Sequence, residues 1–183
     1  YSLWQQRPVA PHIEIERDLQ VAQKVIQEAQ QAGNNEIVEY KAQEILKAYN
    51  LPTPKTGLAR SSQEAISIAT EIGYPVVLKI ASADISHKTD VGGVLVGLKD
   101  KDAVKHGFLQ ITSRAQRLRP EAYITGCLVQ EMAPKGAKEI IVGFNRDPQF
   151  GPLIMFGLGG VYVEILKDIA FRLAPLSRRD AKE

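Results

Sequence analysis

The segment with the most reactive side chains is residues 82–93, which reads SADISHKTDVGG. It places His87 and Lys88 between Asp84 and Asp90 and ends on two glycines. Lysine, threonine and backbone N–H groups can hold a phosphate, and glycine lets the backbone approach a ligand closely. A histidine, with a free pKa of about 6.5, can act as a base or a nucleophile. A solvated turn would have the same composition, so residue chemistry alone leaves both interpretations open.

Two further segments have features that suit a nucleotide. Lys79 ends an apolar stretch, where its ammonium group can hold a phosphate or simply reach water. Residues 128–134 predict a strand that breaks into a turn, which leaves backbone groups of residues 131–133 available to an adenine edge. Glu139, after this turn, can accept hydrogen bonds from ribose hydroxyls. An ordinary strand–turn–strand with exposed charges remains the alternative.

A glycine-rich stretch and two acids follow. Residues 157–160 read GLGG, but Tyr162 takes the last place of a G-x-G-x-x-G pattern, so the match is incomplete. Glu164 and Asp168 are four positions apart and can share a cation if that stretch is helical. Mg²⁺ bound with nucleotide phosphates usually needs only one or two carboxylates. A pair of surface acids is the alternative.

The composition is that of an ordinary globular chain. Of the 183 residues 44% are apolar and 24% charged, and the net charge is +2, which gives no case for nucleic acid or an anionic membrane. The single cysteine, Cys127, excludes an intramolecular disulfide and fits a reducing cytosol. The most apolar stretch, residues 151–166, is shorter than the roughly 20 residues that span a bilayer. We therefore expect a cytoplasmic protein.

Helical and strand patterns alternate along the chain. Apolar spacing predicts helices over residues 13–32, 36–49, 61–72 and 101–119, with a capping box at Ser61 and Glu64. In the last helix the residues expected to face inward are Val104, Phe108, Ile111, Ala115 and Leu118. Strands are expected at residues 54–59, 74–81, 94–98 and 127–131, and a hairpin should join residues 140–144 to 152–156.

This pattern predicts an α+β or mixed α/β fold. We expect residues 1–35 to form a linker and helical arm, residues 36–125 a first lobe and residues 126–183 a second, truncated lobe. The chain opens without Met and closes on what reads as the first turn of a helix, so we expect a piece of a longer protein.

Five segments together resemble the ATP-grasp region of NDP-forming acyl-CoA synthetases, the family typified by ADP-forming acetate–CoA ligase, where this region is the β subunit or part of a fused chain. They are residues 74–79, 84–94, 129–132, 138–143 and 150–160. The resemblance covers roughly residues 36–183. It implies an ATP-grasp fold that binds a nucleotide between two lobes, with an incomplete C-terminal lobe in this chain.

The resemblance also implies a reaction: acyl-CoA + ADP + phosphate ⇌ acid + CoA + ATP, with Mg²⁺ and a phosphohistidine. His87 matches a histidine that carries phosphate towards ADP. Lys79 would contact the phosphates, Glu131 and Met132 the adenine, and Glu139 the ribose. The remaining implied residues are Gln130, Gly159 and Gly160 for the nucleotide and Glu164 and Asp168 for the metal.

The implied partner is a CoA-binding synthetase domain or α subunit that carries the first phosphohistidine, together with a small carboxylic acid or its acyl-CoA, in an oligomer. One alternative is a non-catalytic, ligand-sensing, synthetase-like domain of a protein lysine acetyltransferase, although an intact His87 argues against a dead site. Another is a different ATP-grasp ligase. Carboxylate–amine ligases lack a phosphohistidine carrier, so the residues around His87 disfavour them.

Overall fold

The structure is a computed structural model that describes residues 17–33, 36–159, 169–177 and 180–181. These residues form two compact units, one that ends at Ala133 and one that begins at Pro134. The sequence predicted this boundary near residue 125, before strand β4 (Gly126–Glu131), which is earlier than the division in the structure. The division falls later because β4 pairs with two strands of the first unit.

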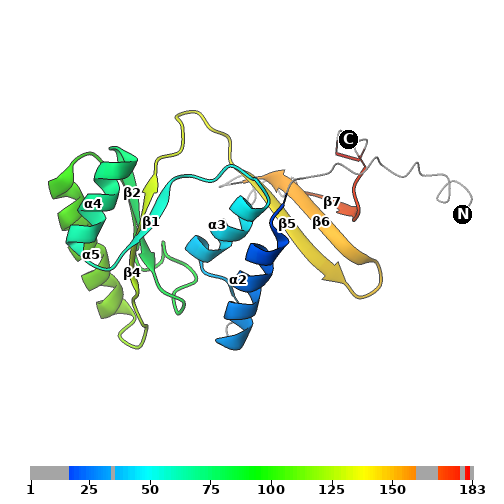
Figure 1. The fold of residues 1–183 in the computed structure, drawn as a ribbon, viewed down its shortest axis with the longest axis horizontal. Helices are drawn as coiled ribbons and strands as arrows, with labels where there is room; N and C mark the ends of the chain where they lie inside the picture. Colours follow the sequence, from blue (N-terminus) through cyan, green and yellow to red (C-terminus); the bar gives the residue numbers. More distant parts are fainter. Residues whose placement is uncertain (1–16, 34–35, 160–168, 178–179, 182–183) are drawn as a thin grey trace, which may run out of the picture. The chain divides into compact units, whose positions relative to one another are not determined.

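The first unit is built on a four-stranded antiparallel sheet in the order β1-β4-β2-β3. Its other strands are β1 (Thr56–Ala59), β2 (Val76–Ala81) and β3 (Val94–Leu98). Helices α4 (Ser62–Ile72) and α5 (Lys101–Leu118) cover one face of this sheet (Figure 1). The strands and helices expected in this unit are therefore present, and β4 reaches the middle of the sheet although it comes last in sequence.

Alternation along β2 decides which side chains meet the helices. Val76, Leu78 and Ile80 are fully buried and belong to the core, which also includes Ala65, Ala69, Val104, Phe108, Ile111, Ala115, Cys127 and Val129. Successive side chains of a strand point to opposite faces of the sheet. Lys79 therefore lies on the face opposite α4 and α5, away from this core.

Side-chain caps set where the two covering helices begin. The Ser61 hydroxyl accepts a hydrogen bond from the Glu64 N–H at 3.1 Å, and the Glu64 carboxylate accepts one from the Arg60 N–H at 2.8 Å, which confirms the predicted capping pair. Asp100 caps α5 through the Ala103 N–H at 2.8 Å. The prediction that Leu118 faces inward was wrong: it is 51% exposed, because α5 ends at this residue.

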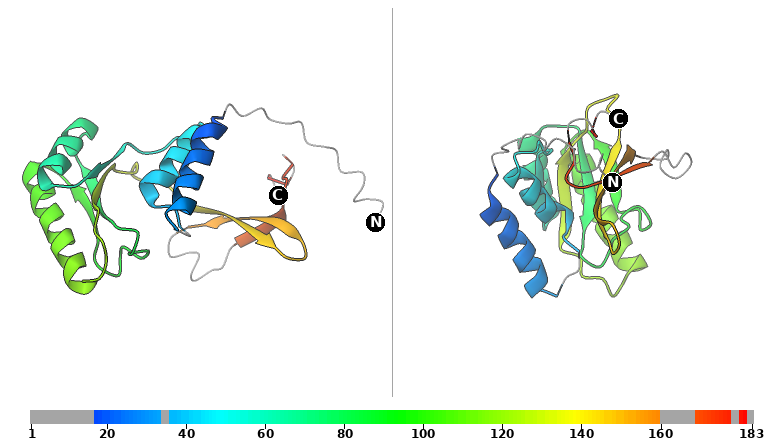
Figure 2. Two further views of the ribbon diagram at one scale, coloured as in Figure 1. Left: turned by 60° about the horizontal axis from the view of Figure 1, so that its bottom comes forward. Right: turned by 90° about the vertical axis from the view of Figure 1, so that its right-hand side faces the viewer.

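Helices α2 (Leu19–Gln31) and α3 (Glu39–Ala48) lie side by side in both figures (Figure 2). Helix α2 begins at Leu19 because Asp18 accepts hydrogen bonds from the N–H groups of Gln20 and Val21. It was expected from residue 13, but residues 13–16 lie outside the described part of the chain. None of the described helices is long and apolar enough to cross a membrane.

The second unit contains a three-stranded antiparallel sheet with β6 in the centre. Strands β5 (Ile140–Asp147) and β6 (Gly151–Leu158) form the predicted hairpin, each longer than expected. Strand β7 (Ile169–Leu173) was not predicted. Alternating apolar residues are exposed on one face of this hairpin: Ile140, Val142, Phe144, Phe156 and Leu158.

Candidate functional site

Residues 82–93 form a closed loop between β2 and β3 whose two sides are fixed in the core. Ile85 and Val91 are only 3% and 5% exposed and belong to the hydrophobic core. The Gly93 N–H donates to the Lys88 carbonyl at 2.7 Å, and the Ile80 N–H donates to the Gly93 carbonyl at 2.7 Å. Apolar burial and backbone hydrogen bonds therefore hold the base of the loop in place.

Gly93 is required by this closure rather than by freedom of movement. A Cβ atom at this position would lie 2.5 Å from Ile80 Cγ2 and 2.9 Å from the Lys88 carbonyl oxygen. Packing at Gly93, Ile85 and Val91 fixes the loop to the core on both sides of His87.

His87 lies at the exposed turn of this loop. Its carbonyl accepts a hydrogen bond from the Asp90 N–H at 3.2 Å, and its imidazole has no hydrogen-bonding partner among the described residues. The nearby Asp84 carboxylate is already used, since it accepts a hydrogen bond from the Tyr123 N–H at 2.8 Å. The imidazole is therefore open to a reactant.

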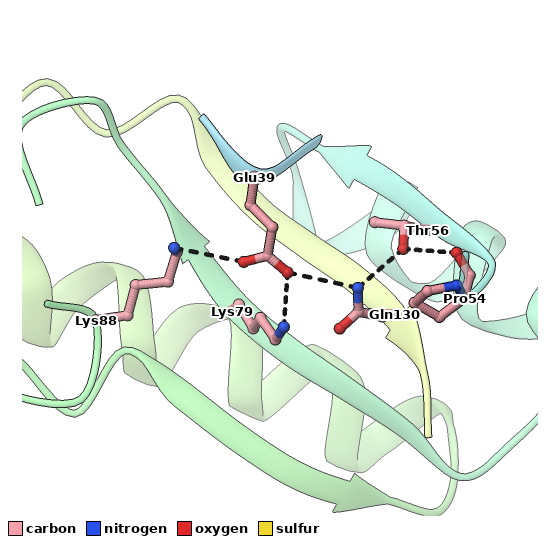
Figure 3. A network of polar contacts seen from close by, with 6 residues as sticks. All are labelled: Glu39, Pro54, Thr56, Lys79, Lys88 and Gln130. Atoms are coloured by element: carbon pink, nitrogen blue, oxygen red, sulfur yellow. Dashed lines mark hydrogen bonds and ion pairs between the residues drawn. The ribbon is translucent and has the colours of Figure 1, made fainter. Parts of the chain in front are cut away.

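Lys79 is joined to this loop through a carboxylate that was not among the sequence-predicted site residues. The Lys79 ammonium lies 2.6 Å from Glu39 Oε1, and the Lys88 ammonium lies 3.4 Å from Glu39 Oε2 (Figure 3). Glu39 is the first residue of α3. One carboxylate from a distant helix thus brings together the strand lysine and the lysine that follows His87.

Gln130 completes this network from the neighbouring strand. Its side chain is buried, and its amide donates to Thr56 Oγ1 at 3.1 Å and to Glu39 Oε1 at 3.5 Å (Figure 3). The register of β2 and β4 places Gln130 opposite Val77, two residues before Lys79. The structure therefore brings Gln130 and Lys79, both expected to contact a nucleotide, to the same carboxylate.

The charge state of Glu39 follows from its surroundings. Burial raises the pKa of this carboxyl, while the hydrogen bond and charge of Lys79, followed by those of Lys88, lower it, and the net pKa lies below the ordinary value. Glu39 is therefore ionised at neutral pH. Two lysines and one carboxylate leave this cluster with one net positive charge.

The end of β4 offers backbone groups, though not all of those expected. The Glu131 N–H donates to the Lys55 carbonyl at 2.9 Å, and the Glu131 carboxylate accepts from the Lys55 N–H at 3.1 Å. Beyond the strand, the N–H groups of Met132 and Ala133 have no backbone partner in the described part of the chain. The Met132 N–H is therefore better placed than the Glu131 N–H to donate a hydrogen bond to a bound ligand.

In the second unit the sheet brings Glu139 and Gly159 together. The Gly159 N–H donates to the Glu139 carbonyl at 2.8 Å, and a Cβ on Gly159 would lie 2.6 Å from Glu139 Cγ. The Glu139 side chain is exposed. Gly160, Glu164 and Asp168 lie outside the described residues, and within the described ranges no group of three or more His, Cys, Asp or Glu side chains could hold a metal ion.

Cys127 is not a candidate nucleophile. It is fully buried in β4, and burial raises the pKa of its thiol to about 12. A thiol in that state is protonated and inert near neutral pH.

Comparison with known proteins identifies the family to which this chain belongs. A family model described as an ATP-grasp domain matches residues 28–183. The β subunit of ADP-forming acetate–CoA ligase I from Pyrococcus furiosus is 47% identical over 162 residues, covering 88% of this chain and 69% of the subunit. The chain belongs to the ATP-grasp domains of ADP-forming acetate–CoA ligases.

Other ATP-grasp relatives extend this match. The ADP-forming 4-hydroxybutyrate–CoA ligase of Nitrosopumilus maritimus is 46% identical over 162 residues, which are 88% of this chain but 23% of that protein. A structure of the acetyl-coenzyme A synthetase 1 of Ca. Korarchaeum cryptofilum with coenzyme A and Ca-AMPCP has a TM-score of 0.84 and 45% identity, covering 88% of this chain and 70% of that one. Another structure of that synthetase, with Mg-AMPPCP, has a TM-score of 0.73 and 40% identity, covering 88% and 68%.

The ATP-grasp assignment confirms the predicted fold class and the family resemblance. These relatives are ligases and synthetases, and no finding favours the ligand-sensing alternative. The individual site residues remain predictions. Sequence reasoning missed Glu39, which is one of three acids in the predicted helix over residues 36–49; only the fold reveals its lysine partners.

Proposed function

We propose that this chain is the nucleotide-binding part of an ADP-forming acyl-CoA ligase, which catalyses acyl-CoA + ADP + phosphate ⇌ acid + CoA + ATP. One observation carries the proposal beyond family membership. An exposed histidine, His87, lies on a firmly anchored loop, and the next residue is joined through Glu39 to Lys79. Phosphoryl transfer to a nucleotide needs an acceptor and cationic groups that neutralise phosphate charge, and the loop with its Glu39-linked lysines would supply both.

In this proposal His87 relays a phosphoryl group. A neutral imidazole nitrogen of His87 attacks the phosphorus of a phosphohistidine on the CoA-binding partner, and the partner's P–N bond breaks. A terminal β-phosphate oxygen of ADP then attacks the same phosphorus, and the P–N bond to His87 breaks to release ATP. Neutral imidazole is a competent nucleophile near pH 7, and Lys79 would neutralise phosphate charge.

The other nucleotide contacts are assigned to both units. Met132 and Glu131 would meet the adenine, with Met132 supplying an N–H that has no backbone partner among the described residues, and Glu139 would bind the ribose. Gln130, Gly159 and Gly160 would complete the nucleotide site. Mg²⁺ would neutralise phosphate charge, with Glu164 and Asp168 as its proposed ligands.

The acid is proposed only as a small carboxylic acid. An acetate ligase and a 4-hydroxybutyrate ligase match this chain at 47% and 46% identity over equal lengths, so this region does not distinguish the two acids. We therefore assign acid recognition to the CoA-binding domain or α subunit, which would also carry the first phosphohistidine. We propose an oligomeric, cytoplasmic enzyme.

Phosphate labelling tests the relay. The full-length protein that contains this chain is incubated with γ-labelled ATP and Mg²⁺, as wild type, as His87→Asn and as His106→Asn. His106 is the matched control, because it is an exposed histidine on α5 whose ring contacts the Asp102 carbonyl at 2.8 Å. We expect acid-labile, base-stable label in the wild type and in His106→Asn. Label at His87, identified by mass spectrometry, should vanish in His87→Asn, with nucleotide affinity within about threefold.

Two outcomes would overturn the proposal. If His87→Asn takes up as much label as the wild type and turns over at the same rate, His87 is not the relay. A wild type that binds ATP but never carries label would instead support the ligand-sensing alternative.

A further inference from the structure

Glu39 holds two lysines that come from different parts of the fold. Lys79 lies on β2 and Lys88 in the loop that carries His87, and both ammonium groups contact the same carboxylate, at 2.6 and 3.4 Å (Figure 3). The exposed fractions of the three side chains are 25%, 27% and 24% for Lys79, Glu39 and Lys88. The cluster is thus partly shielded from water, which strengthens its electrostatic interactions relative to a surface ion pair.

The orientation of this carboxylate is fixed by neighbours outside the pair of lysines. Oε1 receives Lys79 and, more weakly, the amide of buried Gln130, which is itself held by Thr56. Oε2 is left for Lys88. Because each oxygen has its own lysine, the carboxylate acts as a spacer that sets the two ammonium groups at neighbouring positions despite their mutual repulsion.

A role confined to α3 does not account for this arrangement. An acid in the first turn of a helix is favoured by the helix dipole alone, and such a side chain can remain in solvent. Glu39 instead contacts β2, the His87 loop and β4 through its side-chain contacts with Lys79, Lys88 and Gln130. These contacts connect the helix to the loop whose backbone is closed at Lys88.

We propose that Glu39 is a positioning residue for phosphoryl transfer, which holds Lys79 and Lys88 together, in a cluster with one net positive charge, where the phosphoryl group passes between His87 and the nucleotide. This inference rests on the proposed function. Glu39 contacts neither substrate nor the reacting atoms in this scheme and acts through the two lysines. Without it, the ammonium groups would separate, and Lys88 would lose its link to Lys79 on β2.

The test is Glu39→Gln in the full-length protein, which keeps the shape of the side chain and removes its charge. We expect the single-turnover rate of label transfer from γ-labelled ATP to His87 to fall at least about tenfold, since transfer depends on positioned charge. The dissociation constant for ADP should change less than about threefold. In Glu39→Gln the net charge of the cluster rises from +1 to +2, which attracts the ADP phosphates more strongly. This attraction offsets the binding that is lost because the lysines are no longer held in place.

A double-mutant cycle shows whether Glu39 acts through Lys88. If it does, Glu39→Gln combined with Lys88→Met should be no more than about twofold slower than the slower single variant, because both remove the same contact. Glu44→Gln is the matched control, since Glu44 is an acid on the same helix that pairs with Lys41 at 3.4 Å on the surface. It should label His87 at the wild-type rate.

The outcomes separate this inference from the proposed function. If the wild type takes no label, the proposed function fails whatever Glu39→Gln does. If the wild type is labelled and Glu39→Gln is labelled within twofold of its rate, only the positioning role fails. Multiplicative effects of Glu39→Gln and Lys88→Met would also overturn it. If Glu39→Gln does not fold, Lys88→Met alone decides, because a normal rate in that variant removes the loop lysine from the mechanism.

Discussion

The contribution of Glu39 to the stability of the fold should depend on pH. Its pKa is lowered in the folded chain, because Lys79 and Lys88 outweigh the effect of burial. A lowered folded-state pKa contributes stability that is fully present above the unfolded-state value, about 4.3 for a glutamate, and is lost as the pH falls through the folded-state pKa. At pH 7 the carboxylate therefore stabilises the fold.

We expect Glu39→Gln to lower the free energy of unfolding by about 1–2 kcal/mol at pH 7, between the values for exposed and buried ion pairs. The difference from wild type should shrink below about pH 4.3 as the wild-type carboxylate becomes protonated. Urea unfolding of both proteins at pH 7 and at pH 3.5 measures this. A difference that grows on acidification would contradict the electrostatic assignment.

Single residues differ in how far the sequence reveals them. His87 was predictable, because a histidine between a lysine, acids and glycines is an unusual local combination. Glu39 was not, since its partner Lys79 lies 40 positions away in sequence. Its role depends on how α3 meets the sheet, and neither residue type nor spacing encodes that contact.

At the scale of elements, β4 depends on a glycine at its first position. Gly126 has φ +147°, and a Cβ there would overlap the carbonyl oxygen of Ala59. The overlap arises because β1 lies against β4, with Ala59 opposite Cys127. This strand carries Gln130 into the candidate site, so a local clash at its start would disturb the site as well.

We expect Gly126→Ala to destabilise the protein by about 3 kcal/mol or more, because the new side chain meets backbone that cannot move alone. Gly97→Ala is the matched control: Gly97 also has a positive φ, +75°, but nothing lies within 4 Å of a Cβ there. It should cost only about 1–2 kcal/mol of backbone strain. Thermal unfolding compares them, and equal losses would argue against the steric origin.

The elements themselves were largely predictable in the first unit and less so in the second. Caps such as Asp100 and a strong apolar period define α5. Strand β7 was missed, although Ile169, Phe171 and Leu173 alternate with Ala170 and Arg172. A five-residue alternation is short, and what stabilises it is pairing with β6, which is a contact between distant parts of the chain.

At the scale of the whole molecule, residues 132–139 join the two units and lie between β4 and β5. Most of them are exposed, and their backbone contributes one backbone hydrogen bond within the stretch, from the Ala137 N–H to the Pro134 carbonyl at 3.2 Å. A segment with few buried contacts opens locally at low free-energy cost. The same stretch contains Met132 and Glu139, the two residues proposed to meet the adenine and the ribose.

Limited proteolysis can test both the local opening of residues 132–139 and their proposed contacts with the nucleotide. We expect trypsin to cut first after Lys135, which is exposed and followed by Gly136 in a turn, whereas lysines in β2 and α5 are held in regular structure. Saturating ADP should slow this cut at least about tenfold, because a ligand that binds Met132 and Glu139 must be released before the segment can open. Mass spectrometry of the fragments over time follows both rates. Cleavage after Lys135 that is unaffected by a nucleotide which the protein demonstrably binds would remove these two residues from the nucleotide site. The His87 relay would then rest on the loop, Lys79 and Lys88 alone.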